Sequence, residues 1–220
     1  MATGDGRRAT GDGRRAKRAT GKKRQSDYPP PRLTKQPMDL IPTAIPDVVS
    51  LVPARHQDER GSFSETFRAE WFPGLTFVQD NHSHSADPGT IRGLHYQLPP
   101  ADQAKLLRVA RGRIRDVAVD LRDGSPTFLA HVTVELTAAG GEQVLVPSGF
   151  AHGFVTLEPN TVVLYKVTDY YSRELERGIP WNDPALAVDW GIDGEPVLSN
   201  RDRNHPPFDP AKPPFRFGGR

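Results

Sequence analysis

The sequence predicts an all-β domain, either a sandwich or a closed barrel. Short apolar stretches alternate with turn residues, and the 220-residue chain contains 22 prolines and 20 glycines. No amphipathic helical pattern longer than two turns occurs before Trp181. Many short strands separated by close turns are typical of sandwiches and barrels.

About eight or more strands are expected from Ile45 onward. PDVVSLVP is the first, a turn follows at Asp58–Gly61, and SFSETF alternates so that Phe63, Glu65 and Phe67 share one face. The strands that follow are FVQDNHSHS, TIRGLHYQ, AKLLRVARGRIRDVAVDLR, HVTVELT, EQVLVPSGFAHGFVTL and TVVLYKVTDYYS. After Trp181 we expect loops with one short helix following Pro184, capped by Asp183.

Charge separates the chain into two parts. Residues 1–37 carry 11 Lys/Arg against 3 Asp, whereas the other 183 residues carry 18 Lys/Arg against 24 Asp/Glu. The first part repeats ATGDGRR at Ala2–Arg8 and Ala9–Arg15 and has few apolar residues, so we expect disorder. We therefore divide the chain into a disordered basic leader (1–37), one domain (38–205) and a C-terminal tail (206–220).

Two interpretations of the leader remain open. Its charge is suited to a nucleic-acid or anionic surface. Alternatively, it is a solvated extension or reflects an upstream start, with Met38 as the natural first residue. Because the body is mildly acidic, a nucleic-acid partner is not expected for the folded domain.

Composition also excludes several classes of protein. No window approaches the roughly 18 apolar residues of a membrane span, so no membrane partner is expected. The N-terminus lacks the apolar core of a secretory signal, and the chain has no cysteine for a disulfide or thiolate nucleophile. A cytoplasmic location is expected by default.

The segment Thr90–Lys105 concentrates groups that suit proton abstraction beside a carbonyl. Arg92, His95 and Lys105 lie within it in an apolar, strand-like context. Removing such a proton leaves negative charge on oxygen, which a fixed cation stabilises, and histidine is a base that titrates near neutral pH. From the residues alone, a single histidine such as His95 in an apolar strand is more often structural, and Lys105 is more often an ordinary strand-edge lysine.

A second segment, PSGFAHGF at Pro147–Phe154, resembles the later histidine motif of cupin barrels, which are double-sheet jelly rolls. The earlier cupin motif corresponds to His95-Tyr96-Gln97, with no glutamate three or four residues on. Glutamine is a poor ligand, and His95 and His152 alone rarely hold a divalent ion. We therefore expect a cupin-type double-stranded β-helix that holds no metal.

Several segments together resemble the dTDP-4-dehydrorhamnose 3,5-epimerase family. They are DERGSFSETFR, FVQDNHSHS, IRGLHYQLPPADQAKLLRVARG, DVAVDLRDGSPTF, VPSGFAHGFVTL, LYKVTDYYS and WNDP, in matching order between about Met38 and Asp202. The resemblance implies a homodimeric isomerase without metal or organic cofactor. It acts on a dTDP-4-keto-6-deoxyhexose, inverting C3 and C5 of dTDP-4-keto-6-deoxyglucose to give the precursor of dTDP-L-rhamnose.

The resemblance also implies four catalytic roles. His95 is the base, and Asp202 is its paired carboxylate, with Asp183 as a rival for that place. Lys105 stabilises the enolate oxygen, and Tyr165 returns a proton to the opposite face.

Further residues are implied as substrate contacts. His152 is expected near the keto oxygen, Arg92 at the diphosphate, and Arg60 from the partner subunit. Tyr170 and Tyr171 would stack on thymine or belong to the core. The full set of expected contacts is Arg60, Glu65, Gln79, Asn81, Arg92, His152, Tyr170 and Tyr171.

Other interpretations remain open. One is a mono-epimerase, confined to C3 or C5, of a dTDP-4-keto-deoxysugar. Others are a binding or regulatory cupin tethered by the leader and a metal-dependent cupin oxygenase. The residues also leave open whether Asp116 and Asp120 line a polar pocket or face solvent.

Overall fold

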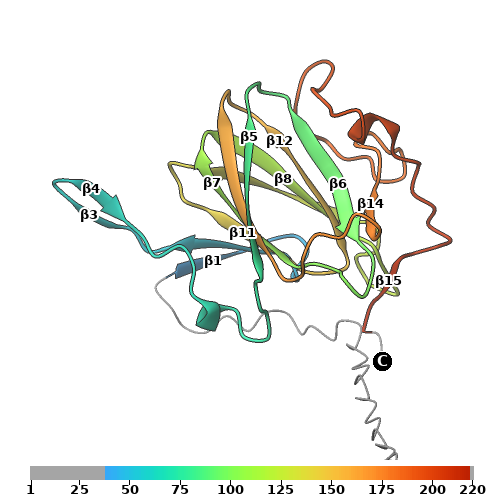
Figure 1. Cartoon of the computed structure of the whole chain (residues 1–220), viewed down its shortest axis with the longest axis horizontal. Helices are drawn as coiled ribbons and strands as arrows, with labels where there is room; N and C mark the ends of the chain where they lie inside the picture. Colours follow the sequence, from blue (N-terminus) through green and yellow to red (C-terminus); the bar gives the residue numbers. More distant parts are fainter. Residues whose placement is uncertain (1–37, 219–220) are drawn as a thin grey trace, which may run out of the picture.

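A computed structural model describes residues 38–218, whose regular elements are almost all strands joined by turns and loops (Figure 1). The leader and its repeat lie outside the described residues. The strands are β1 Met38–Pro42, β2 Val49–Pro53, β3 His56–Asp58, β4 Gly61–Phe63, β5 Gln79–Ser85, β6 Ile91–Gln97, β7 Lys105–Arg111, β8 Arg113–Asp120, β9 Arg122–Asp123, β10 His131–Thr137, β11 Gln143–Val146, β12 Phe150–Thr156, β13 Thr161–Val167, β14 Glu176–Gly178 and β15 Phe215–Arg216. Within this range the helices are two short 3-10 turns, η1 Ala69–Trp71 and η2 Asp202–Asn204.

Two antiparallel sheets stack face to face and form the barrel (Figure 1). Within the described range, one sheet has six strands in the order β1-β2-β11-β7-β13-β5. The other has five strands in the order β10-β8-β12-β6-β14. The expectation of an all-β jelly roll is confirmed.

The core between the sheets comes from alternate residues of their strands. On β8, Ile114 and Ala118 point into this core, whereas Val117 and Val119 belong to a second cluster on the outer face. Residues on both faces of β8 and β12 are buried because both faces of the five-stranded sheet are covered around these two strands. The inter-sheet core consists of Ile45, Val48, Leu107, Val109, Ile114, Ala118, Val132, Leu136, Val144, Val146, Phe150, Phe154 and Val163.

The C-terminal segment covers the outer face of the five-stranded sheet. Ile179, Leu186 and Trp190 are buried against that face. Part of the expected tail also packs here, since Phe215 is buried and β15 pairs in parallel with β9. This packing brings the η2 turn, and with it Asp202, back to the barrel.

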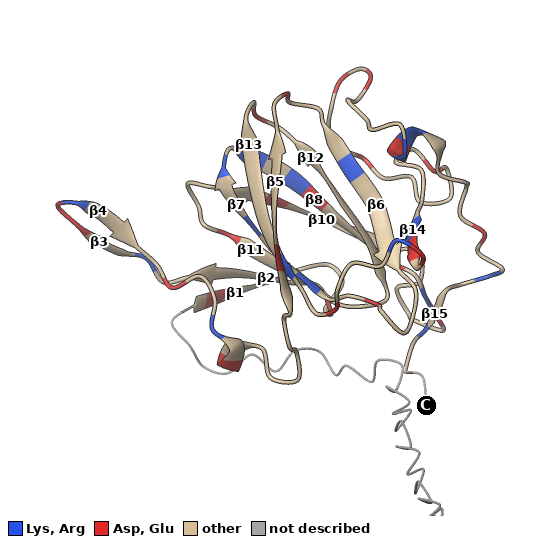
Figure 2. Ribbon diagram, in the orientation of Figure 1, with Lys and Arg blue, Asp and Glu red and all other residues tan. Residues whose placement is uncertain are grey.

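A different layer covers the six-stranded sheet. Trp71 and Phe72 pack there with Leu51, Leu106 and Leu145. The hairpin of β3 and β4 precedes Trp71 in the chain and stands away from the barrel (Figure 1). All of its strand residues are exposed, and it carries both acidic and basic residues (Figure 2).

Four local expectations are wrong. Two expected strands each form two strands that belong to different sheets: AKLLRVARGRIRDVAVDLR gives β7 and β8, and EQVLVPSGFAHGFVTL gives β11 and β12. SFSETF is not a strand throughout, because pairing ends at Phe63, where the hairpin ends. No helix follows Pro184; the Asp183 carboxylate instead accepts the Ala185 amide in a turn, at 2.9 Å. The first strand is also preceded by another, β1, which pairs with β2.

None of the helices between residues 38 and 218 has the length and apolar character needed to cross a membrane.

We predict that Trp190→Ala lowers the free energy of unfolding by about 3–5 kcal/mol, because it leaves a cavity beneath the C-terminal segment. Trp190 is 3% exposed, and its Nε1 donates to the Trp181 carbonyl at 2.7 Å. Urea denaturation measures the loss. Val78→Ala, at a position 38% exposed, is the control and should have little effect.

Candidate active site

A cavity of about 180 Å³ lies between the two sheets, lined by side chains from both. His95 enters it from β6 of the five-stranded sheet, and Tyr165 enters from β13 of the six-stranded sheet. The two side chains therefore share one cavity, on opposite walls. Its lining residues are Ser83, Arg92, His95, Lys105, Leu107, His152, Phe154 and Tyr165.

Strand pairing explains how distant residues meet here. His152 on β12 is the cross-strand partner of His95 on β6. These two strands approach closely because Gly93 faces Gly153; a Cβ at Gly93 would lie 2.6 Å from the Gly153 Cα. Gly93 also has φ of 129°, which favours glycine.

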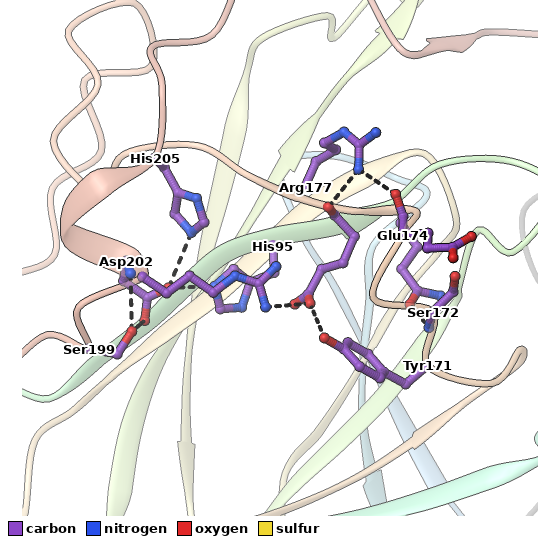
Figure 3. A network of polar contacts seen from close by, with 11 residues as sticks. His95, Tyr171, Ser172, Glu174, Arg177, Ser199, Asp202 and His205 are labelled. Carbon is purple, nitrogen blue, oxygen red and sulfur yellow. Dashed lines mark hydrogen bonds and ion pairs between the residues drawn. The ribbon is translucent and has the colours of Figure 1, made fainter.

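His95 is hydrogen-bonded to Asp202. The distance from His95 Nε2 to Asp202 Oδ1 is 2.6 Å, and Ser199 Oγ donates to Asp202 Oδ2 at 2.9 Å (Figure 3). Burial tends to raise the pKa of Asp202, but hydrogen bonds to His95, Ser199 and His205 outweigh it and lower the pKa. The rival carboxylate, Asp183, accepts backbone amides of Ala185 and Phe208 instead.

The carboxylate determines the tautomer of His95. An ionised carboxylate only accepts hydrogen bonds, so Nε2 must carry the proton. A neutral ring then has its lone pair on Nδ1, which makes Nδ1 the basic nitrogen. The arrangement is that of an oriented general base.

Lys105 is a buried cation beside the same histidine. Its Nζ donates to the backbone carbonyl of His95 at 3.3 Å. Burial lowers the pKa of Lys105 to about 8, while the negative charges of Asp116 and Glu176 oppose the shift. At neutral pH it remains an ammonium group with little surrounding water.

Asp116 is buried behind the cavity wall, against His152, and does not face solvent. It is 1% exposed, and its Oδ2 lies 2.8 Å from His152 Nε2. Burial lowers the pKa of His152 despite this carboxylate, and the nearby Lys105 and His95 lower it further. Asp120 is also buried but serves a different contact, a pair with Arg122 at 2.8 Å.

Tyr165 retains its proton at neutral pH. Burial raises the pKa of Tyr165, with Arg92 acting against the shift. The Arg92 guanidinium is held by Ser85 Oγ at 3.1 Å and by the His84 carbonyl at 2.8 Å. The cavity thus has a phenol on one wall, with a fixed guanidinium close to it.

A polar row on β5 leads away from the cavity. Gln79, Asn81 and Ser83 share one face by alternation, and Ser83 lines the cavity. Gln79 and Asn81 are hydrogen-bonded to each other at 2.7 Å, and Gln79 Oε1 accepts the Tyr171 amide at 3.1 Å. Ser83 Oγ is buried and has no hydrogen-bond partner among the described residues.

The remaining expected contacts lie outside the cavity. Tyr170 and Tyr171 are 65% and 53% exposed, so they belong to no core. Arg60 bonds Asp58 at the tip of the hairpin, and Glu65 pairs with Arg68 just beyond it. Within a single chain, the structure therefore does not bring Arg60 or Glu65 to His95.

Several residues at the site were missed from the sequence. Glu176 accepts the Tyr171 hydroxyl at 2.6 Å and pairs with Arg201 at 2.5 Å. His205 Nε2 lies 3.3 Å from Asp202 Oδ1 (Figure 3). Ser83 could have been found by extending the alternation from Gln79 and Asn81. Glu176 begins the three-residue strand β14 and His205 follows the η2 turn, so neither belongs to a run long enough to show a period.

Known proteins resemble this chain along most of its length. The curated dTDP-4-dehydrorhamnose 3,5-epimerase of Sinorhizobium fredii is 48% identical over 167 residues, covering 74% of this chain and 86% of the relative. A structure of dTDP-6-deoxy-D-glucose-3,5-epimerase from Legionella pneumophila, in complex with dTDP-4-keto-L-rhamnose, has a TM-score of 0.72 and 43% identity. It covers 75% of this chain and 89% of that chain.

A single-position enzyme is similar as well. The 3'-monoepimerase of Streptomyces bikiniensis, in complex with dTDP-quinovose, has a TM-score of 0.71 and 35% identity, covering 76% of this chain and 86% of that one. The family model described as dTDP-4-dehydrorhamnose 3,5-epimerase matches residues 42–210. The match extends over both sheets and the segment that carries Asp202, and the chain belongs to the dTDP-4-dehydrorhamnose 3,5-epimerase family.

Proposed function

We propose that this chain is a cofactor-independent epimerase that inverts C3 and C5 of dTDP-4-keto-6-deoxyglucose through enolate intermediates. The observation that carries the proposal is the shared cavity, in which a carboxylate-oriented imidazole and a protonated phenol stand on opposite walls. Inversion needs a base on one face of the sugar and an acid on the other. The relative bound to dTDP-4-keto-L-rhamnose supports this substrate class.

In the proposed mechanism, His95 Nδ1 takes the proton from the carbon beside the ketone. Asp202 then stabilises the imidazolium through the hydrogen bond at Nε2. Tyr165, which faces His95 across the cavity, delivers a proton to the other side of the same carbon. The imidazolium then releases its proton to solvent and the Tyr165 phenolate takes one from solvent, which resets both groups, and the same steps invert the second carbon.

Lys105 would hold the negative charge that forms on the ketone oxygen. Its burial is the reason for this role, because a charge in a water-poor site stabilises an enolate more strongly than one in water. Its contact with the His95 carbonyl fixes the ammonium close to the base.

The size of the cavity suggests where the nucleotide lies. At about 180 Å³ it is smaller than the roughly 300–1,000 Å³ of sites that enclose a whole drug-sized ligand. It therefore suits the sugar alone. Arg92 at the cavity would bind the diphosphate, and the row of Asn81 and Gln79 leads outward to the exposed Tyr170 and Tyr171.

A dimer would complete this site. The β3–β4 hairpin stands away from the barrel, and Phe63 on it is 67% exposed (Figure 1). Arg60 at its tip has a side chain that is 83% exposed, and Glu65 follows the hairpin. We propose that the hairpin docks on a second copy of the chain, so that Arg60 and Glu65 contact the substrate in the partner's cavity.

Incubation with dTDP-4-keto-6-deoxyglucose in heavy water tests the function directly. We expect NMR to find deuterium at both C3 and C5, because each inverted carbon takes its new proton from solvent. Label at one carbon only would identify a mono-epimerase. No label at either carbon, with a folded protein, would contradict epimerisation.

The pH dependence tests Lys105. The pKa of Lys105 is lowered to about 8, so its charge is present below that value and is lost as the pH rises through it. We expect kcat to fall over this range in the wild type. Lys105→Ala should lower kcat by about 100-fold, as for loss of an oxyanion donor, and should remove this limb of the profile. An unchanged kcat in Lys105→Ala would exclude the role.

Mixing two inactive variants tests the shared site. Arg60→Ala and His95→Ala each damage every site of a homodimer, but a mixed dimer has one site with an intact His95 and an intact Arg60 from its partner. After unfolding and refolding together, equal amounts should recover about a quarter of wild-type activity. If Arg60 served its own subunit's cavity, the mixture would remain as inactive as its components.

A further inference from the structure

A third polar side chain joins the His95–Asp202 pair from outside the cavity. His205 Nε2 lies 3.3 Å from the same Asp202 oxygen, Oδ1, that His95 Nε2 contacts at 2.6 Å (Figure 3). One donor atom from each of these three residues lies within 4.8 Å of the other two. Among the described residues, no other such group of three or more is found.

We propose that His95, Asp202 and His205 form a binding site for Zn²⁺ and similar divalent ions, and that occupancy switches off the base. Two imidazoles and one carboxylate are ligands that Zn²⁺ prefers, with one position left for water. This set differs from the pattern of cupin metal sites, because His152 is bonded to Asp116 and takes no part.

The surroundings already orient these ligands. Ser199 Oγ holds Asp202 Oδ2 at 2.9 Å, which leaves Oδ1 directed between the two imidazoles. Such outer contacts fix metal ligands in position. Arg201, the cation next to Asp202, is neutralised by Glu176 at 2.5 Å and so repels an approaching ion less.

His205 is held in place by a glycine. A Cβ at Gly178 would lie 2.2 Å from both Cε1 and Nε2 of the His205 ring. Because Gly178 is also the cross-strand partner of His95, this glycine lets the second imidazole pack against the strand pair that carries the first. Any side chain at position 178 would push the His205 ring aside.

An ion can reach the cluster without entering the sugar cavity. His205 also lines a groove of about 420 Å³ on the outside of the barrel, together with Tyr96, Arg201 and Phe208. His95 lines the inner cavity. The three ligands therefore stand in the wall between groove and cavity, and the groove offers an entry path that a bound nucleotide sugar would leave open.

The inhibitory step follows from the tautomer of His95. In the free protein Nε2 carries the proton and Nδ1 the lone pair. A metal ion bonds the lone pair of a neutral imidazole nitrogen, so binding at Nε2 moves that ring proton to Nδ1. The ring stays neutral and no electron is transferred, but the basic nitrogen is lost. This inhibitory part rests on the proposed epimerase function, whereas the binding site itself does not.

The first test is binding of Zn²⁺ and Co²⁺ to the full chain, after chelator treatment and dialysis. Calorimetry should find one ion per chain. In ¹⁵N NMR, the His95 proton should move from Nε2 to Nδ1 on adding Zn²⁺. His205→Gln keeps a donor near Asp202 but supplies a poor ligand, and it should weaken binding at least about 10-fold.

Gly178→Ala provides a second, independent variant, since it displaces the His205 ring and should weaken binding too. His82→Gln is the matched control, because His82 lies exposed on β5 and belongs to no such cluster. Absence of saturable one-to-one binding would overturn the proposal. So would binding that His82→Gln abolishes and that His205→Gln and Gly178→Ala leave unchanged.

The second test is activity. Zn²⁺ should inhibit the wild type, EDTA should restore it, and His205→Gln should raise the Zn²⁺ concentration for half inhibition at least about 10-fold. Binding without inhibition would overturn the inhibitory step. If the untreated chain exchanged no deuterium with substrate but bound the ion as described, the proposed function would fail and the metal site would stand.

Discussion

The hydrogen bond between His95 and Asp202 is the interaction on which the rest of the site depends. Its two residues are 107 positions apart, one on a central strand and the other in a short turn of the C-terminal segment. Asp202 stays ionised despite its burial because His95, Ser199 and His205 all bond to it. The contact therefore requires the long irregular C-terminal segment to pack against the barrel. The buried side chains of Trp190 and Phe215 hold that segment there by apolar contacts.

The double covering of the sheets explains the electrostatics of the cavity. With apolar layers on both outer faces, the space between the sheets holds little water, so charges there are strongly perturbed. Burial lowers the pKa of Lys105 and His152 and raises that of Tyr165. The negative charge of Asp116 opposes the lowering for Lys105 and His152. Despite these shifts, Lys105 remains charged and Tyr165 remains protonated at neutral pH, so the cavity keeps a cation and a phenolic proton donor.

Much of the barrel could be predicted because strand periodicity is a local property. The alternation along β8 assigns Asp116 to one face of the strand, but it does not indicate whether that face is buried or exposed to solvent. Asp202 and Tyr165 came from the family resemblance and not from any pattern. Glu176 and His205 were missed because their positions depend on how the C-terminal segment packs. The helix expected after Pro184 failed for a similar reason, since the Asp183 carboxylate there also accepts the distant Phe208 amide.

The late position of Asp202 in the chain affects how the protein is made. Apart from the short strand β14, both sheets are complete once residue 167 has been synthesised. His95, Lys105 and Tyr165 therefore all lie on strands that are synthesised before Asp202. The strands of the cavity and the carboxylate that contacts His95 thus come from successive parts of the chain, and their contact requires the C-terminal segment to pack on the barrel.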